Sequence, residues 1–221
     1  MRSIEINSLL DLSKTEFSDI FNNMKYPYEV LKVIGDYIMK KGPLLGPDYK
    51  MIKENVWVGD GTTIADSASI TGPSIIGRNC EIRHCAFIRG NALIGDNCVI
   101  GNSTEIKNSM YFNNVQTPHF NYVGDSVLGY KSHIGAGVIL SNVRSIPGEV
   151  KIRIGEAIIN TGLRKFSAVL GDHVEVGCNS VLNPGTIVGK NSVVYPLSSV
   201  RGVVPESHIF KNDGTVVKIK K

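Results

Sequence analysis

Two cations in this chain have a spacing that suits the binding of a phosphate group. Arg89 and Lys107 each directly follow a large apolar residue, and they are eighteen positions apart. If eighteen residues complete one coil of a stacked structure, the two side chains lie on one outer corner, about 4.8 Å apart. Cations held this close repel each other, and a bound anion relieves the repulsion. The pair therefore indicates a phosphate site, with two solvated surface charges as the alternative.

Histidine suits general-base chemistry because its ordinary pKa lies near neutral pH. His119 lies in a polar stretch, where its side chain can project into a cleft, and it is the candidate base. His133 directly precedes the apolar Ile134, so it should point outward, where it either orients a ligand or faces water. Lys165 lies in a later polar stretch and is either a functional or an ordinary loop cation.

The segment from Ile134 to Val138 reads Ile-Gly-Ala-Gly-Val and offers backbone N–H groups to a ligand, because its two glycines carry no side chain. Such N–H groups stabilise a developing oxyanion. Glycine is also the ordinary corner residue of a repeat, so this motif alone does not decide between catalysis and turn geometry.

The elements that must position these residues follow a six-residue rhythm. The residue two places before each apolar position is small at almost every step, and residues i and i−2 of a strand point to the same side. Both columns therefore face a narrow interior. A period of six is typical of a hexapeptide β-helix and fits neither an amphipathic helix nor a long alternating strand. The repeating positions are Val58, Ile64, Ile70, Ile76, Ile82, Ile88, Ile94, Ile100, Ile106 and Phe112.

Glycines indicate that three hexads complete one coil. Gly59, Gly77 and Gly95 follow the large apolar residue at intervals of eighteen, as expected for one stacked corner that requires a positive φ. Successive coils should then lie one strand spacing apart, about 4.8 Å. Residues eighteen positions apart in the sequence are therefore expected to lie about 4.8 Å apart in space.

The cysteines are better explained by packing than by metal binding. Cys80 and Cys98 fall in the small inward column, and neither Cys85 nor Cys178 has a partner at a CxxC spacing. We therefore expect no zinc site. Reduced thiols are typical of the cytoplasm.

Two interruptions break the rhythm. After Phe112 it resumes at Tyr122, which predicts a loop insertion near residues 113–121. A second interruption near residues 141–167 contains the apolar stretch 150–154, which predicts a short strand in an excursion. The rhythm otherwise continues at Leu128, Ile134, Leu140, Leu170, Val176, Leu182, Val188, Val194 and Val200.

The flanking segments complete the expected organisation. We expect residues 1–50 to form a helical cap, with two helices between about residues 8 and 41 that cover the open end of the column. Ser13 and Glu16 resemble a capping box, and Pro27 suits a first helical turn. Residues 51–205 form the β-helix, and residues 206–221 form a hairpin at Asn212-Asp213-Gly214 and a tail.

Composition favours one soluble, cytoplasmic domain. The chain has 221 residues, of which 42% are hydrophobic, and a formal net charge of +4. No apolar run approaches the roughly 18 residues of a membrane span, and no basic-then-apolar leader precedes the repeats. The small net charge favours neither nucleic acid nor a membrane surface as a partner.

Several polar motifs carry a resemblance to a known family. The run from His119 to Asp125, the segment 134–137 and Asn142 resemble the acetyltransferase domain of bifunctional glucosamine-1-phosphate acetyltransferase/N-acetylglucosamine-1-phosphate uridylyltransferases. Segments 161–166 and 171–174 resemble archaeal-type sugar-1-phosphate nucleotidylyltransferase/acetyltransferases. The resemblance covers most of residues 26–205, and no Gly-rich nucleotide-binding loop occurs near the N-terminus. We therefore expect the acetyltransferase half without nucleotidyl transfer.

The resemblance implies a left-handed parallel β-helix that assembles as a homotrimer with sites between subunits. It also implies an acetyl-CoA-dependent N-acetyltransferase that acts on an amino-sugar 1-phosphate and requires no metal. In this family the base corresponds to His119, while the backbone N–H of Ala136 supports the acetyl thioester and the main chain of Cys178 approaches coenzyme A. The implied substrate-binding residues are Arg89, Lys107, Tyr122, Asn142 and Lys165, to which we add His133.

Two other classes remain open. A non-catalytic sugar-phosphate or nucleotide-sugar binding module would keep Arg89 and Lys107 but need no thioester donor. A γ-type carbonic anhydrase shares the hexad fold, but His84, His119 and His133 do not provide its closely spaced histidine pair.

Overall fold

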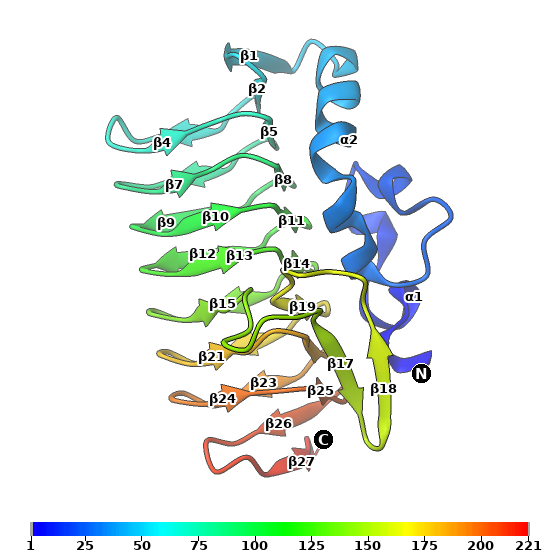
Figure 1. The fold of residues 1–221 in the computed structure, drawn as a ribbon. Helices are drawn as coiled ribbons and strands as arrows, with labels where there is room; N and C mark the ends of the chain where they lie inside the picture. The colour runs from blue at the N-terminus through cyan, green and yellow to red at the C-terminus, as the bar shows by residue number, and fades with distance from the viewer. Residues whose placement is uncertain (1, 221) are drawn as a thin grey trace.

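The computed structural model describes residues 2–220 as a column of stacked coils with a helical segment along one side (Figure 1). Successive coils contribute strands to three sheets, which we number 1 to 3 in the order the chain visits them. The column is a left-handed parallel β-helix, so the expected fold class is confirmed. Within the described residues, no helix has the length and apolar character needed to cross a membrane.

The strands of the three sheets follow one another along the column. Sheet 1 contains β1 (Tyr49–Lys53), β2 (Val56–Gly59), β5 (Ser74–Ile76), β8 (Ala92–Ile94), β11 (Ser109–Tyr111), β14 (Val127–Leu128), β19 (Ala168–Leu170), β22 (Thr186–Val188) and β25 (Val203–Val204). Sheet 2 contains β3 (Thr63–Ile64), β6 (Glu81–Ile82), β9 (Val99–Asn102), β12 (Gln116–His119), β15 (His133–Ile134), β20 (Glu175–Val176), β23 (Val193–Val194), β26 (His208–Phe210) and β27 (Val216–Lys218). Sheet 3 contains β4 (Ser69–Ile70), β7 (Phe87–Ile88), β10 (Glu105–Lys107), β13 (Tyr122–Gly124), β16 (Ile139–Leu140), β21 (Val181–Leu182) and β24 (Ser199–Val200).

The interior of the column is filled by the inward residues of the hexads. Ile88 and Ile106 pair across sheet 3, and both are fully buried. Cys80 and Cys98 are 2% and 0% exposed, and the backbone N–H of Cys98 donates to the Cys80 sulfur at 3.4 Å. The predicted inward column is therefore confirmed, and these two cysteines serve as small packing residues.

The prediction of an insertion at residues 113–121 is wrong. This segment contains β12, which lies in sheet 2 in register with β9 and places Thr117 inward. In the following strand the inward residue is Val123, so Tyr122 points outward and not into the column. His119 therefore ends a strand of the column instead of occupying an inserted loop.

The rhythm shifts here because two successive coils are one residue shorter. Ile94 pairs with Tyr111, which pairs in turn with Leu128, at intervals of seventeen. Phe112 mimics an inward residue because it is also fully buried. Its ring lies outside the column, 5.9 Å from that of Phe21 in the helical segment.

The stacked glycines have a different reason from the predicted one. Gly59, Gly77 and Gly95 stack as expected, but none of them has a positive φ. The left-handed residues lie two positions later, as at Asn79 (φ 52°) and Asn97 (φ 57°). A Cβ at Gly77 would lie 2.5 Å from the carbonyl carbon of Gly95. Close approach of neighbouring coils, and not backbone conformation, therefore requires glycine here.

The N-terminal helical segment lies along the outer face of sheet 1 and not over an open end of the column (Figure 1). Ile34 and Ile38 pack in one cluster with Ile75 and Leu93, which point outward from sheet 1. An apolar outer face needs a second layer, which explains this position. The segment contains η1 (Arg2–Ile4), α1 (Ile6–Leu9), η2 (Leu12–Lys14), η3 (Ser18–Phe21), η4 (Pro27–Lys32), α2 (Ile34–Lys41) and η5 (Gly42–Leu44).

The predicted capping box does not form. The side chain of Asp11 accepts from the Ser13 N–H at 3.0 Å and caps η2, while Glu16 accepts from Arg78 at 2.8 Å. Glu16 thereby ties the helical segment to the column. Pro27 does begin η4, as expected.

Three antiparallel hairpins depart from the regular parallel coils, and the first pairs β1 with β2 at the start of the column. Residues 141–167 form an excursion in which β17 (Lys151–Ile154) pairs with β18 (Ala157–Asn160). Ile152 of β17 packs in the same apolar cluster as the outward residues of sheet 1. The C-terminal hairpin pairs β26 with β27 around Asp213, as predicted.

Two edges of the column carry the candidate residues, and we name each after the two sheets that it connects. The 2–3 corner contains residues 84–86, 120–121, 135–138, 177–180 and 195–198. The 3–1 corner contains residues 89–91, 108, 125–126, 141–142, 183–185 and 201–202.

Candidate functional site

One row of candidate residues lies at the 2–3 corner in successive coils, with His119 as the last residue of the strand that leads into this corner. The backbone N–H of Gly137 donates to the carbonyl of His119 at 3.1 Å, which places Ala136 one coil beyond the histidine. Cys178 follows in the next coil, where its sulfur would lie 2.8 Å from a Cβ at Gly135. The structure therefore brings His119, Ala136 and Cys178 together, although 59 positions separate the first from the last.

Two groups in this row are free to act on a ligand. Within residues 2–220 the Ala136 N–H has no hydrogen-bond acceptor, whereas the flanking Gly135 N–H donates to Val176 at 2.7 Å. The His119 side chain is exposed, and its ring makes no hydrogen bond to the same described residues. A free N–H and a free imidazole on one corner suit oxyanion stabilisation and proton transfer.

Asn121 holds this corner together. It is 3% exposed, its Nδ2 donates to the Gly135 carbonyl at 2.7 Å, and its Oδ1 accepts from the His119 N–H at 3.2 Å. The side chain thus fixes the backbone of His119 against the next coil. Nothing in the sequence pattern singles out Asn121, because a corner asparagine is common in this repeat.

A second group lies on sheet 3 and the 3–1 corner. The pairing of Ile88 with Ile106 places Arg89 and Lys107 at matching positions one coil apart, which confirms their predicted stacking. Each cation has a carboxylate partner: Arg89 pairs with Glu105 at 2.6 Å, and Lys107 with Asp125 at 3.1 Å. These partners relieve part of the repulsion between the two cations, so stacking alone does not require a bound anion.

Asp125 is the central acceptor of this second group. It is 3% exposed and accepts from Lys107 Nζ, from Asn108 Nδ2 at 2.8 Å and from Asn142 Nδ2. A buried carboxylate is stable only when it is paired and hydrogen-bonded, and Asp125 is both. It thereby fixes two of the predicted substrate-binding side chains. Its partners lie up to eighteen positions away, so the sequence alone does not reveal this role.

Tyr122 and Asn142 approach each other over Gly124. A Cβ at Gly124 would lie 2.6 Å from the Tyr122 hydroxyl and 2.9 Å from Asn142 Nδ2, so only glycine leaves room for them. Burial raises the pKa of the Tyr122 phenol above its ordinary value, and the carboxylates of Asp125 and Glu105 raise it further. The phenol therefore stays protonated near neutral pH and can donate a hydrogen bond.

Lys165 joins this second group, whereas His133 does not. The Phe166 N–H donates to the Asn142 carbonyl at 3.1 Å, which brings the exposed Lys165 to the 3–1 corner. His133 lies on sheet 2 with its Nδ1 atom 2.7 Å from Glu175 Oε2. In the described part of the chain, no three His, Cys, Asp or Glu side chains gather into a metal-binding group.

The two groups lie at opposite ends of the same strand. The three residues of β13 separate His119 on one side from the Asp125 group on the other. At about 3.3 Å per residue this strand is roughly 10 Å long. A small ligand lying across sheet 3 could contact both groups at once.

We predict that Asp125→Ala lowers the free energy of unfolding by about 1–3 kcal/mol, because it leaves Asn142 Nδ2 and Lys107 Nζ without their acceptor. The control is Glu105→Ala, which removes the partner of the more exposed Arg89 and should lower the free energy of unfolding much less, because solvent screens an exposed ion pair. Urea unfolding of both variants measures the difference. Equal losses would contradict a central structural role for Asp125.

Known proteins share this chain's sequence over most of its length. It is 31% identical over 220 residues to the bifunctional protein GlmU of Methanococcus vannielii, covering 96% of this chain and 53% of that protein. It is 33% identical over 231 residues to the bifunctional sugar-1-phosphate nucleotidylyltransferase/acetyltransferase of Sulfurisphaera tokodaii, covering 92% of this chain and 56% of that protein. The chain thus spans about half the length of the curated relatives it matches.

Solved structures and a family model give two further matches. The structure of Arabidopsis UDP-N-acetylglucosamine acyltransferase is similar with a TM-score of 0.49 and 14% identity, over 72% of this chain and 62% of that one. The family model of the GMPPB C-terminal domain matches residues 70–194, which is more than half of the chain and includes both groups of candidate residues. The chain therefore belongs to the GMPPB C-terminal domain family.

Proposed function

We propose that this chain is an acyltransferase that transfers an acetyl group from acetyl-CoA to the amine of an amino-sugar 1-phosphate such as glucosamine 1-phosphate. One observation carries the proposal: His119 and the free Ala136 N–H share a corner, one strand away from the stacked Arg89 and Lys107. The name of the Sulfurisphaera relative supports the same chemistry, since that protein is described as a sugar-1-phosphate nucleotidylyltransferase/acetyltransferase.

In this proposal the group on sheet 3 binds the acceptor. Arg89 and Lys107 hold the phosphate, because hydrogen bonds between a cationic side chain and a phosphate oxygen are stronger than those between neutral groups. The protonated Tyr122 and the nearby Lys165 add donors, and Asn142 contacts the amino sugar. Bound in this way across sheet 3, the sugar directs its amine toward the 2–3 corner.

The 2–3 corner performs the transfer. His119 removes a proton from the amine as the amine nitrogen attacks the thioester carbonyl carbon, and the Ala136 N–H donates to the oxyanion that forms. The C–S bond then breaks, the amide remains on the sugar, and the proton held by His119 passes to the departing sulfur of coenzyme A. The backbone at Cys178 lies along the thioester donor, and the Cys178 thiol takes no part.

The most direct experiment measures coenzyme A release from acetyl-CoA in the presence of a panel of hexosamine phosphates. We expect release with an amino-sugar 1-phosphate and none with the corresponding sugar phosphate that lacks the amine. Binding of sugar phosphates without release would instead favour the non-catalytic module and reject the proposed transfer.

For His119→Ala we predict a fall in kcat of roughly 10²–10⁴-fold with the fold retained, because positioned general-base assistance is of that size. His84→Ala is the matched control, since His84 lies on the same 2–3 corner but is hydrogen-bonded to Ser67 at 2.6 Å. Steady-state kinetics and circular dichroism check both variants. Wild-type turnover in His119→Ala would reject its role as the base.

For Arg89→Ala we predict a rise of roughly tenfold or more in KM for the sugar phosphate, with a smaller effect on acetyl-CoA, because one charge-assisted contact is lost. Arg83→Ala removes a similar cation that pairs with Glu81 on sheet 2 and should leave KM unchanged. An unchanged KM in Arg89→Ala would count against the phosphate site.

We also propose a homotrimer with the sites between subunits. Large apolar side chains are exposed along the 2–3 corner, with Phe120 at 59%, Tyr195 at 42% and Leu197 at 70%, as expected for a surface that another subunit covers. Size-exclusion chromatography with light scattering should give three times the mass of the chain. A monomer at micromolar concentration would contradict the interfacial site.

A further inference from the structure

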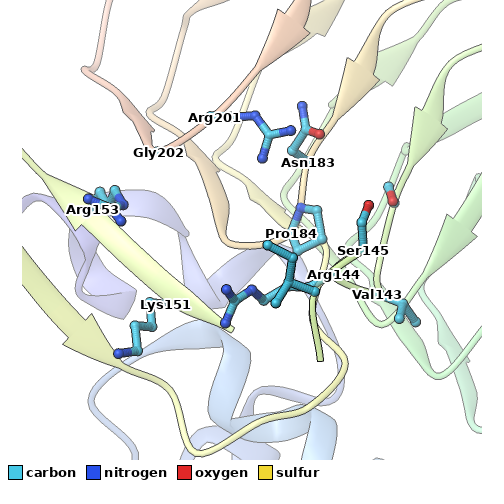
Figure 2. Close-up of a pocket in the computed structure, with 11 residues that line it drawn as sticks. Val143, Arg144, Ser145, Lys151, Arg153, Asn183, Pro184, Arg201 and Gly202 are labelled. Carbon is cyan, nitrogen blue, oxygen red and sulfur yellow. The ribbon is translucent and has the colours of Figure 1, made fainter. Parts of the chain in front are cut away.

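A pocket at the 3–1 corner collects cations that the proposed transfer does not use. It is an open cavity of about 380 Å³ between the loop after Asn142, strand β17 and the turns around Asn183 and Arg201 (Figure 2). We call it the basic pocket. Small-molecule pockets in proteins measure about 300–1,000 Å³, so its size suits a small ligand and not a macromolecular surface.

The charges of the basic pocket have one sign. Its lining includes Arg144, Lys151, Arg153 and Arg201 and no carboxylate. Within residues 2–220 none of these four side chains forms an ion pair, unlike Arg89 and Lys107. Arg144 donates to the Glu149 carbonyl at 2.8 Å, which fixes its guanidinium without neutralising it. A concave surface lined by unneutralised cations concentrates anions.

The fold holds these cations together from distant parts of the chain. Strand β17 alternates, with Ile152 buried and with Lys151 and Arg153 exposed on its other face. The carbonyl of Lys151 would lie 2.6 Å from a Cβ at Gly185, so this corner glycine (φ +87°) lets the hairpin dock on the column. Docking brings both cations to the pocket that Arg201 also lines, as Figure 2 shows.

Apolar side chains border the same pocket. Val143 and Ile146 are 53% and 73% exposed, and Pro184 completes this part of the lining. A single inorganic anion would make no use of them. A ligand that carries both phosphates and a flat apolar part, such as a nucleotide base, would cover the apolar side chains while its phosphates neutralise the cations.

We infer that the basic pocket binds the diphosphate group of a nucleotide-bearing small molecule, at a site separate from Arg89 and Lys107. Four cations from three segments exceed what one phosphate group can neutralise, and arginine forks pair well with phosphate oxygens. Two kinds of molecule carry this chemistry, nucleoside diphosphates and coenzyme A. The inference does not rest on acyl transfer, because binding is measured without turnover.

Calorimetric titration of the full chain with inorganic pyrophosphate tests the inference. We expect binding at least tenfold tighter than that of inorganic phosphate, and a loss of tenfold or more in the double variant Arg153→Gln/Arg201→Gln. The control Lys50→Gln/Arg83→Gln removes the same charge from two surface ion pairs and should bind as the wild type does. No binding by the wild type, or equal binding by both double variants, would overturn the inference.

Two further readouts complete the test. Hydrogen exchange of the unaltered chain should slow in β17 when pyrophosphate is added, which needs no variant to fold, and unchanged exchange there would count against the pocket. UDP and coenzyme A are then each titrated against bound pyrophosphate. Displacement by UDP assigns the pocket to a nucleoside diphosphate, displacement by coenzyme A assigns it to the acyl donor, and displacement by neither rejects a nucleotide ligand.

Discussion

Hydrogen bonds between successive coils determine where every candidate residue lies. Each coil is bonded to the next along three parallel sheets, as where the Arg89 N–H donates to the Ile106 carbonyl at 2.8 Å. Parallel strands bonded in this way lie about 4.8 Å apart. Residues one coil apart in the sequence are therefore neighbours in space, and an outward side chain on the corner of one coil lies directly beside its counterpart on the next. The two groups of polar residues are both products of this stacking.

Sheet 3 relates the two groups to each other. Its strands are only two or three residues long, so the 2–3 corner with His119 and the 3–1 corner with Asp125 lie a short, fixed distance apart. A long loop would allow that distance to vary. Strand β13 keeps it fixed because it is hydrogen-bonded to β10 on one side and to β16 on the other. The buried side chains Asn121 and Asp125 then fix the local geometry at each end. The column thus holds the two groups of side chains at set positions relative to each other.

Much of this arrangement follows from the sequence because the inner column is strictly periodic. The inward positions of Ile88 and Ile106, and with them the stacking of Arg89 on Lys107, depend only on coil length. Periodicity is misleading where a second layer buries the outer face of the column. Phe112 is as buried as an inward residue, so the sequence of the seventeen-residue coils resembles that of an inserted loop. The position of the helical segment does not follow from the hexads for the same reason, since the apolar outer face of sheet 1 can be identified only once the true register is known.

The electrostatic partners were beyond the reach of sequence periodicity. Glu105 and Asp125 neutralise the two stacked cations through side-chain contacts that spacing does not encode. Arg153 and Arg201 are 48 positions apart and line the same pocket only because a hairpin folds back on the column. A crystal structure with acetyl-CoA and glucosamine 1-phosphate tests the central claim most directly. We expect the phosphate within hydrogen-bond distance of Arg89 and Lys107, with the amine and the thioester carbonyl beside His119 and the Ala136 N–H. A phosphate bound away from sheet 3, or a thioester bound away from the 2–3 corner, would contradict the account.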